Sequence, residues 1–548
     1  MKLIECVPNF SEGRDRTVID AIVAAIDAVD GVDVLDVDPG EATNRTVVTF
    51  AGAPAAVEEA ALAGMATAAE LIDMRHHRGE HPRMGATDVC PFVPLEDATM
   101  DDAIALARRV AERAGAELGI PIYLYEYAAP EGRRSLAEVR RGEYEGLAGR
   151  QDAPDFGPRW NERSGATAVG ARPFLIAYNV NLNTKDRRLA HQVAQAIRTL
   201  GTPVRDAEGK IVKDEHGKTV FEPGRFEEVK AVGWYIDEYD RAQVSINLTD
   251  FHVSPMHAVF DACRQEAAAR GMRVTGSEVV GLVPLEAMLM AGDHYLRAQG
   301  TTTGVPEAER VRTAIVSLGL EELGPFEPGR KIVEYRLRGE PGRLGSMPLG
   351  DLVDAVSEAT PTPGGGSVAA AVGALGAALT SMVAGLTHAK RGMEDRRETM
   401  EDLGRRAQEL KDRLLRAVDE DTTAFEAVLT AIRMPKRTDE DRDARTQAMA
   451  EANLRATTVP LEVMETAVEV LELARTTVEL GNPSSVTDAA VGAECAATAV
   501  EGASMNVRVN LQGLDGDTTG MRERHDRALT RARSLLAAIR ETVDDRLG

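Results

Sequence analysis

The residues best suited to proton chemistry lie together in the stretch Met74–Asp88. It contains three of the ten histidines of the chain, three arginines, one glutamate and one aspartate. An imidazole can accept and release a proton near neutral pH without a shifted pKa. The stretch therefore predicts a site of proton transfer. Its side chains could bind a metal, carry out acid–base chemistry or belong to a polar surface loop.

A metal site is one interpretation of this stretch. His77, Glu80 and His81 fit the H-x-x-E-H spacing of certain zinc hydrolases. That spacing serves a metal on a helix, where residues four positions apart share one face. Gly79 weakens a helix by about 1 kcal/mol relative to alanine, and Pro82 disfavours the helical conformation of the residue before it. The sequence therefore favours proton transfer without a metal.

His81 is the preferred proton-transfer residue of the stretch. The proline after it restricts its backbone, and Glu80 and Arg83 flank it. His76 and His77 follow a predicted helix, and a cation is stabilised near a helix C-terminus. These two histidines could therefore cap that helix instead.

Two further groups of residues could support the histidine. Asp38 ends a predicted strand beside a turn, shortly before Arg45. A carboxylate there could orient an imidazole or hold a substrate amine, and it could equally be a turn former. The stretch Ser164–Arg172 is rich in small residues and matches neither the P-loop nor the G-x-G-x-x-G motif. Small side chains would let a flat ring approach the backbone, and close strand packing would explain them as well.

Two groups in the last third of the chain form a second candidate site. The segment Gly364–Ser367 precedes a predicted helix, whose first backbone NH groups could bind an anion. A flexible linker would have the same composition. Asp421 belongs to a run of three acidic residues in the middle of another predicted helix. Such residues point in different directions, so one could face a cleft while the others are solvated. A fully solvated run is the alternative.

The elements that must position these residues change type along the chain. Up to about residue 325, predicted strands alternate with helices, which indicates an α/β or α+β fold. The tetrapeptide Val-Pro-Leu-Glu occurs at Val93–Glu96 and at Val283–Glu286, which suggests two related subdomains. Beyond a segment rich in proline and glycine, the apolar residues have helical spacing. We therefore predict α/β subdomains at 1–180 and 181–325, a linker at 326–347 and a separate all-α domain at 348–548.

The composition restricts the classes of partner and location. Lys and Arg number 64 against 88 Asp and Glu, a net charge of −24. Nucleic acid and membrane surfaces require a broad positive field, so neither is an expected partner. The four cysteines form no C-x-x-C pair, which indicates a reducing compartment. The sequence has no signal-peptide pattern and no uninterrupted apolar run of about 18 residues. We therefore expect a cytoplasmic protein.

Several segments resemble the bifunctional formimidoyltransferase–cyclodeaminase family of one-carbon folate metabolism. The resemblance covers essentially the whole chain in the family's domain order, and it implies an α/β transferase part followed by an all-α cyclodeaminase. The segments that carry it are Glu5–Gly13, Gly79–Gly85, Asp88–Phe92, Gly165–Arg172, Val274–Glu278, Val283–Leu285, Pro361–Ser367 and Val418–Phe425.

The resemblance implies an enzyme of histidine degradation that catalyses two consecutive reactions. The first transfers the formimidoyl group from N-formimidoyl-L-glutamate to N5 of tetrahydrofolate. The second cyclises 5-formimidoyltetrahydrofolate to 5,10-methenyltetrahydrofolate and releases ammonia. Tetrahydrofolate, with or without a polyglutamate tail, would be a co-substrate, and no metal would be needed. A homo-oligomer is implied as well, because the family's cyclodeaminase sites form at helical subunit interfaces.

Carried over by position, the resemblance assigns the catalytic histidine to His81 and a supporting carboxylate to Asp38. The proton-handling carboxylate of the cyclodeaminase falls on Asp421. One histidine near its free pKa could take the proton from N5 and return it to the departing glutamate nitrogen. Arginines could bind the carboxylates of glutamate or of the folate tail. The expected substrate- and folate-binding residues are Arg45, Arg83, Gly165, Ala166, Thr167, Gly170, Arg172, Gly364, Gly365, Gly366 and Ser367.

Alternatives remain open at the level of sequence. The donor could be formylglutamate, and the helical domain could act as a methenyltetrahydrofolate cyclohydrolase, because these reactions involve the same carbon with a different leaving group. A metal-dependent hydrolase would use His77, Glu80 and His81. A folate-binding scaffold would bind the ligand without forming product.

Overall fold

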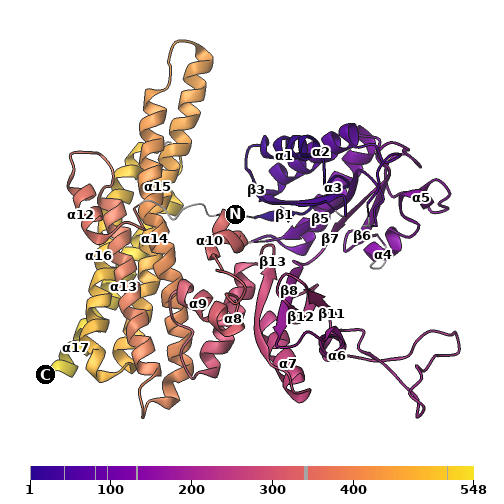
Figure 1. The fold of residues 1–548 in the computed structure, drawn as a ribbon. Coiled ribbons are helices and arrows are strands. Elements are labelled where there is room, and N and C mark those ends of the chain that lie inside the picture. Colours follow the sequence, from indigo (N-terminus) through magenta and orange to yellow (C-terminus); the bar gives the residue numbers. More distant parts are fainter. Residues whose placement is uncertain are drawn as a thin grey trace. The chain divides into compact units, whose positions relative to one another are not determined.

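The computed structural model describes residues 2–41, 43–79, 82–95, 97–130, 134–337, 344–514 and 516–548. The chain separates into two units (Figure 1). The first comprises Met1–Ala287 with Leu318–Leu337, and the second comprises Met288–Ser317 with Arg338–Gly548. In their described parts, the first unit mixes strands and helices and the second is helical. The predicted fold class is therefore confirmed.

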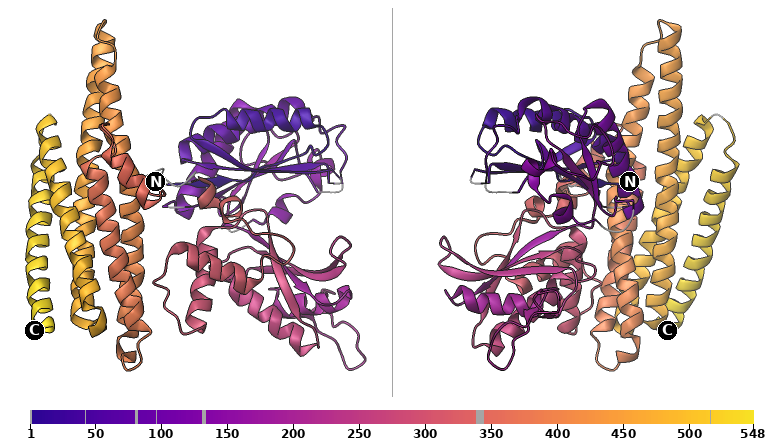
Figure 2. Two further views of the ribbon diagram at one scale, coloured as in Figure 1. Left: turned by 60° about the vertical axis from the view of Figure 1, so that its left-hand side comes forward. Right: turned by 90° about the vertical axis from the view of Figure 1, so that its right-hand side faces the viewer.

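A mixed sheet forms the first subdomain, with helices α1, α2 and α3 on one face (Figure 2). In the described part of the chain its strand order is β1-β4-β2-β5-β7-β6, with β3 beside β4. Strands β5, β7 and β6 are parallel. The elements are β1 Ile4–Cys6, β2 Asn9–Phe10, α1 Arg16–Asp27, β3 Val32–Gly40, β4 Arg45–Gly52, α2 Pro54–Leu71, β5 Thr87–Pro94, α3 Met100–Glu117, β6 Ile122–Glu126 and β7 Thr167–Ala171.

The apolar pattern explains why these segments adopt these structures. In α1, Ile19, Ile22 and Ile26 recur at three- and four-residue spacing and all are buried, which gives the helix one apolar face. Strand residues such as Phe50 and Phe92 pack into the same core. The histidine stretch follows α2 and leads directly into β5, so this core fixes both of its ends.

A second, antiparallel sheet forms the other subdomain, in the order β11-β12-β8-β13. Helices α6 and α7 pack against it. It also holds buried amides: Gln243 Nε2 donates to Asn181 Oδ1 at 2.6 Å. The elements are β8 Ile176–Leu182, α6 Arg187–Ile197, β9 Thr202–Pro203, β10 Phe221–Glu222, β11 Val229–Ile236, β12 Arg241–Leu248, α7 Met256–Ala269 and β13 Val274–Val280. Short helices elsewhere in this unit are α4 Leu136–Val139, α5 Glu143–Leu147, α10 Pro328–Lys331 and α11 Val333–Leu337.

Long helices build the second unit, and α13 packs against α14, α15 and α16. A Cβ at Gly376 would lie 2.6 Å from the carbonyl oxygen of Gly492, so small residues allow close approach. In the described part of the chain, α13 is the one helix long and apolar enough to cross a membrane. Of its most apolar 18-residue segment, 56% is buried. A central bundle helix has the same properties. The helices are α8 Leu285–Ala298, α9 Glu307–Leu318, α12 Leu349–Ser357, α13 Gly365–His388, α14 Arg397–Arg433, α15 Asp439–Leu480, α16 Val486–Asn510 and α17 Thr519–Leu547.

The helical unit includes residues 288–317, which the sequence assigned to the second α/β subdomain. Arg297 Nε and Thr303 Oγ1 each donate to Glu401 Oε1 at 2.9 Å. These bonds attach the segment to α14. The domain limits expected at residues 180, 325 and 347 remain predictions.

A backbone contact places the histidine stretch against the small-residue stretch. Gly85 and Gly165 form a β-bridge, and Ala166 N donates to the carbonyl oxygen of Met84 at 3.0 Å. Gly165 has a φ of +68°, and a Cβ there would lie 2.2 Å from the same carbonyl oxygen. Two stretches singled out in the sequence therefore lie side by side.

We expect Gly165→Ala to destabilise the first unit by about 1–3 kcal/mol, because it adds a steric conflict to a left-handed backbone conformation. Gly119→Ala is the matched control, since Gly119 has a φ of +64° and no heavy atom within 4 Å of its Cβ position. Differential scanning calorimetry of the full chain measures both variants. Equal losses of stability would contradict a role for the contact with Met84.

Candidate active sites

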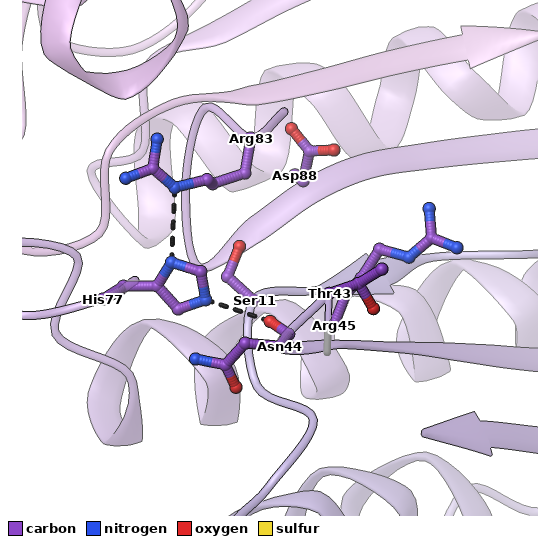
Figure 3. A pocket seen from close by; sticks show the side chains of 7 residues that line it. All are labelled: Ser11, Thr43, Asn44, Arg45, His77, Arg83 and Asp88. Carbon is purple, nitrogen blue, oxygen red and sulfur yellow. Dashed lines mark hydrogen bonds between the residues drawn. The ribbon is translucent and has the colours of Figure 1, made fainter. Parts of the chain in front are cut away.

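A pocket in the first unit is formed by the histidine stretch and two turns (Figure 3). One turn follows β2 and the other connects β3 to β4. The lining residues are Ser11, Thr43, Asn44, Arg45, His77, Arg83 and Asp88. Three segments that are distant in the sequence therefore meet at one set of polar groups.

Asn44 ties these three segments together. Its φ of +48° is left-handed, a conformation that asparagine tolerates better than most residues. Its Oδ1 accepts from Gly13 N at 3.0 Å, and its Nδ2 donates to the carbonyl oxygen of Arg78 at 2.9 Å. The turn between β3 and β4 is thereby fixed to the rest of the pocket.

His77 is held by both ring nitrogens. Arg83 Nε donates to Nδ1 at 3.3 Å, and Nε2 lies 3.0 Å from the carbonyl oxygen of Asn44. An arginine only donates and a carbonyl only accepts, so the ring is neutral with its proton on Nε2. Burial, the largest cause, lowers the pKa of His77, and the charge of Arg83 acts in the same direction. His77 therefore connects Asn44 to Arg83.

Arg83 is buried and forms a two-pronged ion pair. Its Nη1 and Nη2 donate to the two carboxylate oxygens of Glu145 at 2.8 and 2.7 Å. Glu143 Oε2 lies 3.4 Å from Nη1. Hydrogen bonding to Glu145 raises the pKa of Arg83. Both carboxylates belong to the short helix α5. The hydrogen-bond donors of the Arg83 guanidinium are therefore bound by glutamates of the chain itself.

Asp88 is the buried carboxylate of the pocket, with 1% of its surface exposed. Its Oδ1 accepts from Met84 N at 2.8 Å, and Oδ2 forms an ion pair with Arg140. Burial raises the pKa of Asp88, although Arg140 opposes the shift. Burial also lowers the pKa of Arg45, while the charges of Asp88 and Asp38 oppose that shift. Asp38 therefore acts on the pocket through Arg45.

In the helical unit, Asp421 packs against the first turn of α13. Ser367 Oγ donates to Asp421 Oδ2 at 3.0 Å and lies 3.2 Å from Thr422 Oγ1. A Cβ at Gly366 would lie 2.1 Å from Asp421 Oδ1, so glycine makes room for the carboxylate. Burial raises the pKa of Asp421, and hydrogen bonds from Ser367 oppose the shift. The group is a carboxyl with an increased affinity for protons.

The two preceding carboxylates have other partners. Asp419 accepts from the backbone amides of residues 344 and 345, both at 2.9 Å. Glu420 forms ion pairs with two arginines, at 3.2 and 3.3 Å. The run is therefore not uniformly solvated, and of the three it is Asp421 that faces Ser367.

Three parts of the chain match known protein families. Residues 3–172 match the family described as "Formiminotransferase domain, N-terminal subdomain", residues 177–338 match "Formiminotransferase domain", and residues 348–529 match "Formiminotransferase-cyclodeaminase". The formimidoyltransferase-cyclodeaminase of Rattus norvegicus is 41% identical over 533 residues, which are 96% of this chain and 95% of that protein. The chain belongs to the formimidoyltransferase-cyclodeaminase family.

Relatives with a single activity are shorter. The glutamate formimidoyltransferase of Streptococcus pyogenes is 40% identical over 305 residues, covering 54% of this chain and 94% of that protein. The methenyltetrahydrofolate cyclohydrolase of Methylorubrum extorquens is 35% identical over 171 residues, 31% of this chain and 82% of that protein. The chain is therefore an enzyme that joins a formimidoyltransferase part to a cyclodeaminase part, and the resemblance found in the sequence is confirmed.

The predicted transferase residues are only partly brought together. Arg45 and Arg83 line the pocket, and Asp38 is exposed on β3 beside Arg45. Glu80 and His81 lie outside the described residues, so the catalytic role of His81 stays a prediction. Arg140, which directly follows α4, was not predicted from the sequence.

The small-residue stretch is buried within the first sheet. Strand β7 is buried along its whole length, and Thr167 Oγ1 donates to a carbonyl oxygen of β5 at 2.6 Å. A Cβ at Gly170 would lie 2.5 Å from the ring of Tyr125. Close packing thus accounts for the small residues here, including Gly165 and Ala166. Their expected contact with folate stays a prediction.

Arg172, after β7, lies near a buried glutamate that the sequence did not single out. Glu5 is 3% exposed, and burial raises its pKa to about 8, with Arg172 opposing and Glu334 reinforcing the shift. Glu5 sits between apolar residues of a short strand, where no spacing rule distinguishes it from a solvent-facing position. The guanidinium Nη1 of Arg172 donates to the carbonyl oxygen of Pro173 at 3.0 Å.

The predicted cyclodeaminase residues are brought together. Gly364 precedes α13, and Gly365, Gly366 and Ser367 form its first turn. Asp421 lies against this turn, as described above. The nearest side-chain atom to a Cβ at Gly365 would be Asn506 Nδ2, at 3.9 Å. Asn506 and Thr422 are neighbours that sequence spacing could not identify.

The metal alternative finds no support in the described part of the chain. No group of three or more His, Cys, Asp or Glu side chains among those residues could hold a metal ion. Of the three residues proposed, Glu80 and His81 lie outside that part. His77 uses both ring nitrogens for Arg83 and Asn44.

We expect His77 to titrate below 6.5, the ordinary value for histidine, and to carry its proton on Nε2 at pH 7. Because its pKa is lower in the folded state, its contribution to stability is complete above about pH 6.5 and decreases as the pH falls below that value. Nitrogen NMR of histidine-labelled protein measures both properties, with His77→Gln identifying the signal. A midpoint above 6.5, or a proton on Nδ1, would show that the ring is held differently.

Proposed function

We propose that the first unit transfers the formimidoyl group from N-formimidoyl-L-glutamate to N5 of tetrahydrofolate. In this proposal the helical unit then cyclises 5-formimidoyltetrahydrofolate to 5,10-methenyltetrahydrofolate and releases ammonia. The observation that carries it is Asp421, a carboxyl with a raised pKa set against the glycine-rich first turn of α13. This group occurs in a chain that matches bifunctional relatives over both of its parts.

The transfer step requires one proton to change places. N5 attacks the amidine carbon and loses its proton, and the bond from that carbon to the glutamate nitrogen breaks as the nitrogen gains a proton. His81 is assigned both proton transfers by its position in the family motif. Arg45 and Arg83 are proposed to bind substrate carboxylates, and neither step requires a metal.

The cyclisation step has the same proton balance at a second nitrogen. N10 attacks the carbon of the protonated formimidoyl group and releases its proton to Asp421. The amino group formed on that carbon takes the proton back and leaves as ammonia, which yields the methenyl cation. A carboxyl whose pKa is raised by burial is suited to hold a proton between these events.

We expect His81→Ala to lower the transferase rate by about 10²–10⁴-fold and to leave the cyclodeaminase rate unchanged, since general acid–base groups contribute about that much. Asp421→Asn is expected to produce the reverse pattern. Each reaction is measured separately, the second from the absorbance of methenyltetrahydrofolate when 5-formimidoyltetrahydrofolate is supplied.

Matched variants control for indirect effects. Asp419→Asn removes a carboxylate two residues from Asp421 that instead binds the backbone of residues 344 and 345. His76→Ala removes a neighbouring histidine of the histidine stretch and should keep full transferase activity. Retention of full transferase activity by His81→Ala would reject its assignment. Equal loss of cyclodeaminase activity in the Asp419 and Asp421 variants would reject a specific role for Asp421.

A second candidate function is supported by one relative. The match to a methenyltetrahydrofolate cyclohydrolase makes hydrolysis of the methenyl product by the helical unit the alternative activity, with formylglutamate as an alternative donor. Tetrahydrofolate supplied with either the formimidoyl or the formyl donor distinguishes the candidates. Ammonia release with the formimidoyl donor supports the first proposal, and turnover with the formyl donor alone supports the second.

We also propose a homo-oligomer with cyclodeaminase sites at helical subunit interfaces. Val368, Leu375 and Met382 recur two helical turns apart on α13 and are 38%, 57% and 41% exposed. They form an apolar stripe that begins beside Ser367. Exposed apolar patches of this kind mark interaction surfaces. A cytoplasmic location is proposed as well, because the four cysteines, all described, are free.

We expect Leu375→Glu to dissociate the oligomer and lower cyclodeaminase activity while transferase activity persists, because the charge would be buried in the interface. Light scattering coupled to gel filtration measures the mass. Val316→Glu is the matched control, since Val316 is 63% exposed on α9 and lies off the stripe. An unchanged mass for Leu375→Glu would exclude α13 from the interface.

A further inference from the structure

The geometry and burial of Arg83 suit the binding of a carboxylate. The side chain of Arg83 is 9% exposed, whereas the side chain of Glu145, which it binds, is 60% exposed. The two Nη–Oε distances of 2.8 and 2.7 Å describe the parallel geometry that arginine forms with any free carboxylate. The arginine is therefore the fixed partner, and the glutamate is the one that can move into water.

The orientation of Arg83 does not depend on Glu145 alone. Its Nε donates to His77 Nδ1 at 3.3 Å, and His77 is itself anchored on Asn44. This bond turns both Nη groups of the guanidinium toward the carboxylate position. If Glu145 left, the bond to His77 would keep the guanidinium in the same orientation. Arg83 would still line the pocket with Asp88 and Arg45.

Glu145 lies on a short helix, α5, that is anchored on both sides of it: Tyr144 N donates to the carbonyl oxygen of Arg83 at 2.9 Å, and Leu147 is buried. The exposed side chain of Glu145 can leave Arg83 without movement of the helix. The Glu145 side of the pair is 60% exposed, so water competes with Arg83 for this carboxylate. Glu145 can therefore occupy the carboxylate position on Arg83 and can still be replaced there by another carboxylate.

We propose that Glu145 stands in for a substrate carboxylate on Arg83 and must be displaced before that substrate binds. Glu145 is thus a specificity-determining residue: it excludes ligands without a carboxylate and weakens the apparent affinity for those that have one. The inference rests on the proposed transferase function. The displacing carboxylate could belong to formimidoylglutamate or to the glutamate tail of tetrahydrofolate, which share this chemistry.

Replacing Glu145 by Gln is the direct test. Removing an internal competitor raises the fraction of enzyme whose Arg83 is free to bind substrate, so we expect a KM about 2- to 5-fold lower at unchanged kcat. Glu143→Gln is the graded control, because Glu143 has a single 3.4 Å contact with Arg83; its effect should be smaller. A lower KM for the formimidoyl donor assigns the position to glutamate, and a lower KM for tetrahydrofolate assigns it to the folate tail.

A binding measurement separates this inference from the proposed reaction. Calorimetric titration of the full chain with glutarate should show tighter binding to Glu145→Gln than to the unaltered chain, and weaker binding to Arg83→Lys. This result requires no catalysis, so it would stand even if the proposed reaction failed. Unchanged or weaker binding to Glu145→Gln, with binding still dependent on Arg83, would overturn the stand-in role alone. Binding that is independent of Arg83 would overturn the arginine as a carboxylate site as well.

Discussion

The close approach of Gly85 and Gly165 is the constraint on which the pocket of the first unit depends. Both residues precede parallel neighbouring strands, β5 and β7, so their segments enter the first sheet at the same edge. A side chain at either position would collide with the backbone of the other segment. The pocket therefore lies at the amino-terminal edge of these strands. Ligands of open parallel sheets usually bind at the opposite, carboxyl-terminal edge.

The buried carboxylates of the two candidate sites, Asp88 and Asp421, have different partners. Asp88 in the pocket of the first unit is buried against Arg140, and a buried charge normally requires such a partner. Asp421 in the helical unit instead receives a hydroxyl and a backbone amide from Ser367. Burial raises the pKa of both groups, but a cation opposes the shift only at Asp88. The arrangement at Asp88 suits a fixed structural charge, and the arrangement at Asp421 suits a group that exchanges protons.

The sequence was most informative where local pattern determines structure. Apolar spacing predicted the α/β part and the helical part. Helix geometry allowed one carboxylate of the acidic run to differ from its neighbours but left a fully solvated run open as well. Contacts between segments far apart in the chain could not be predicted from the sequence. Nothing near Arg83 indicates that Glu145 would bind it, and nothing near Glu5 indicates burial, because both depend on segments that meet only in the folded chain. The small residues near Gly170 allowed two explanations, and only the position of Tyr125 supplies one of them.

The three carboxylates of α14 also limit how this helix can change in length. Asp419 holds the backbone of residues 344 and 345, Glu420 pairs with arginines and Asp421 meets α13. Successive residues of a helix are rotated by about 100°. A single insertion or deletion upstream in α14 would therefore turn all three carboxylates away from their partners at once. A change of two whole turns would nearly restore the rotation but would displace the carboxylates by about 10 Å along the helix axis. These contacts therefore fix the length of α14 before Asp419 as well as its rotation.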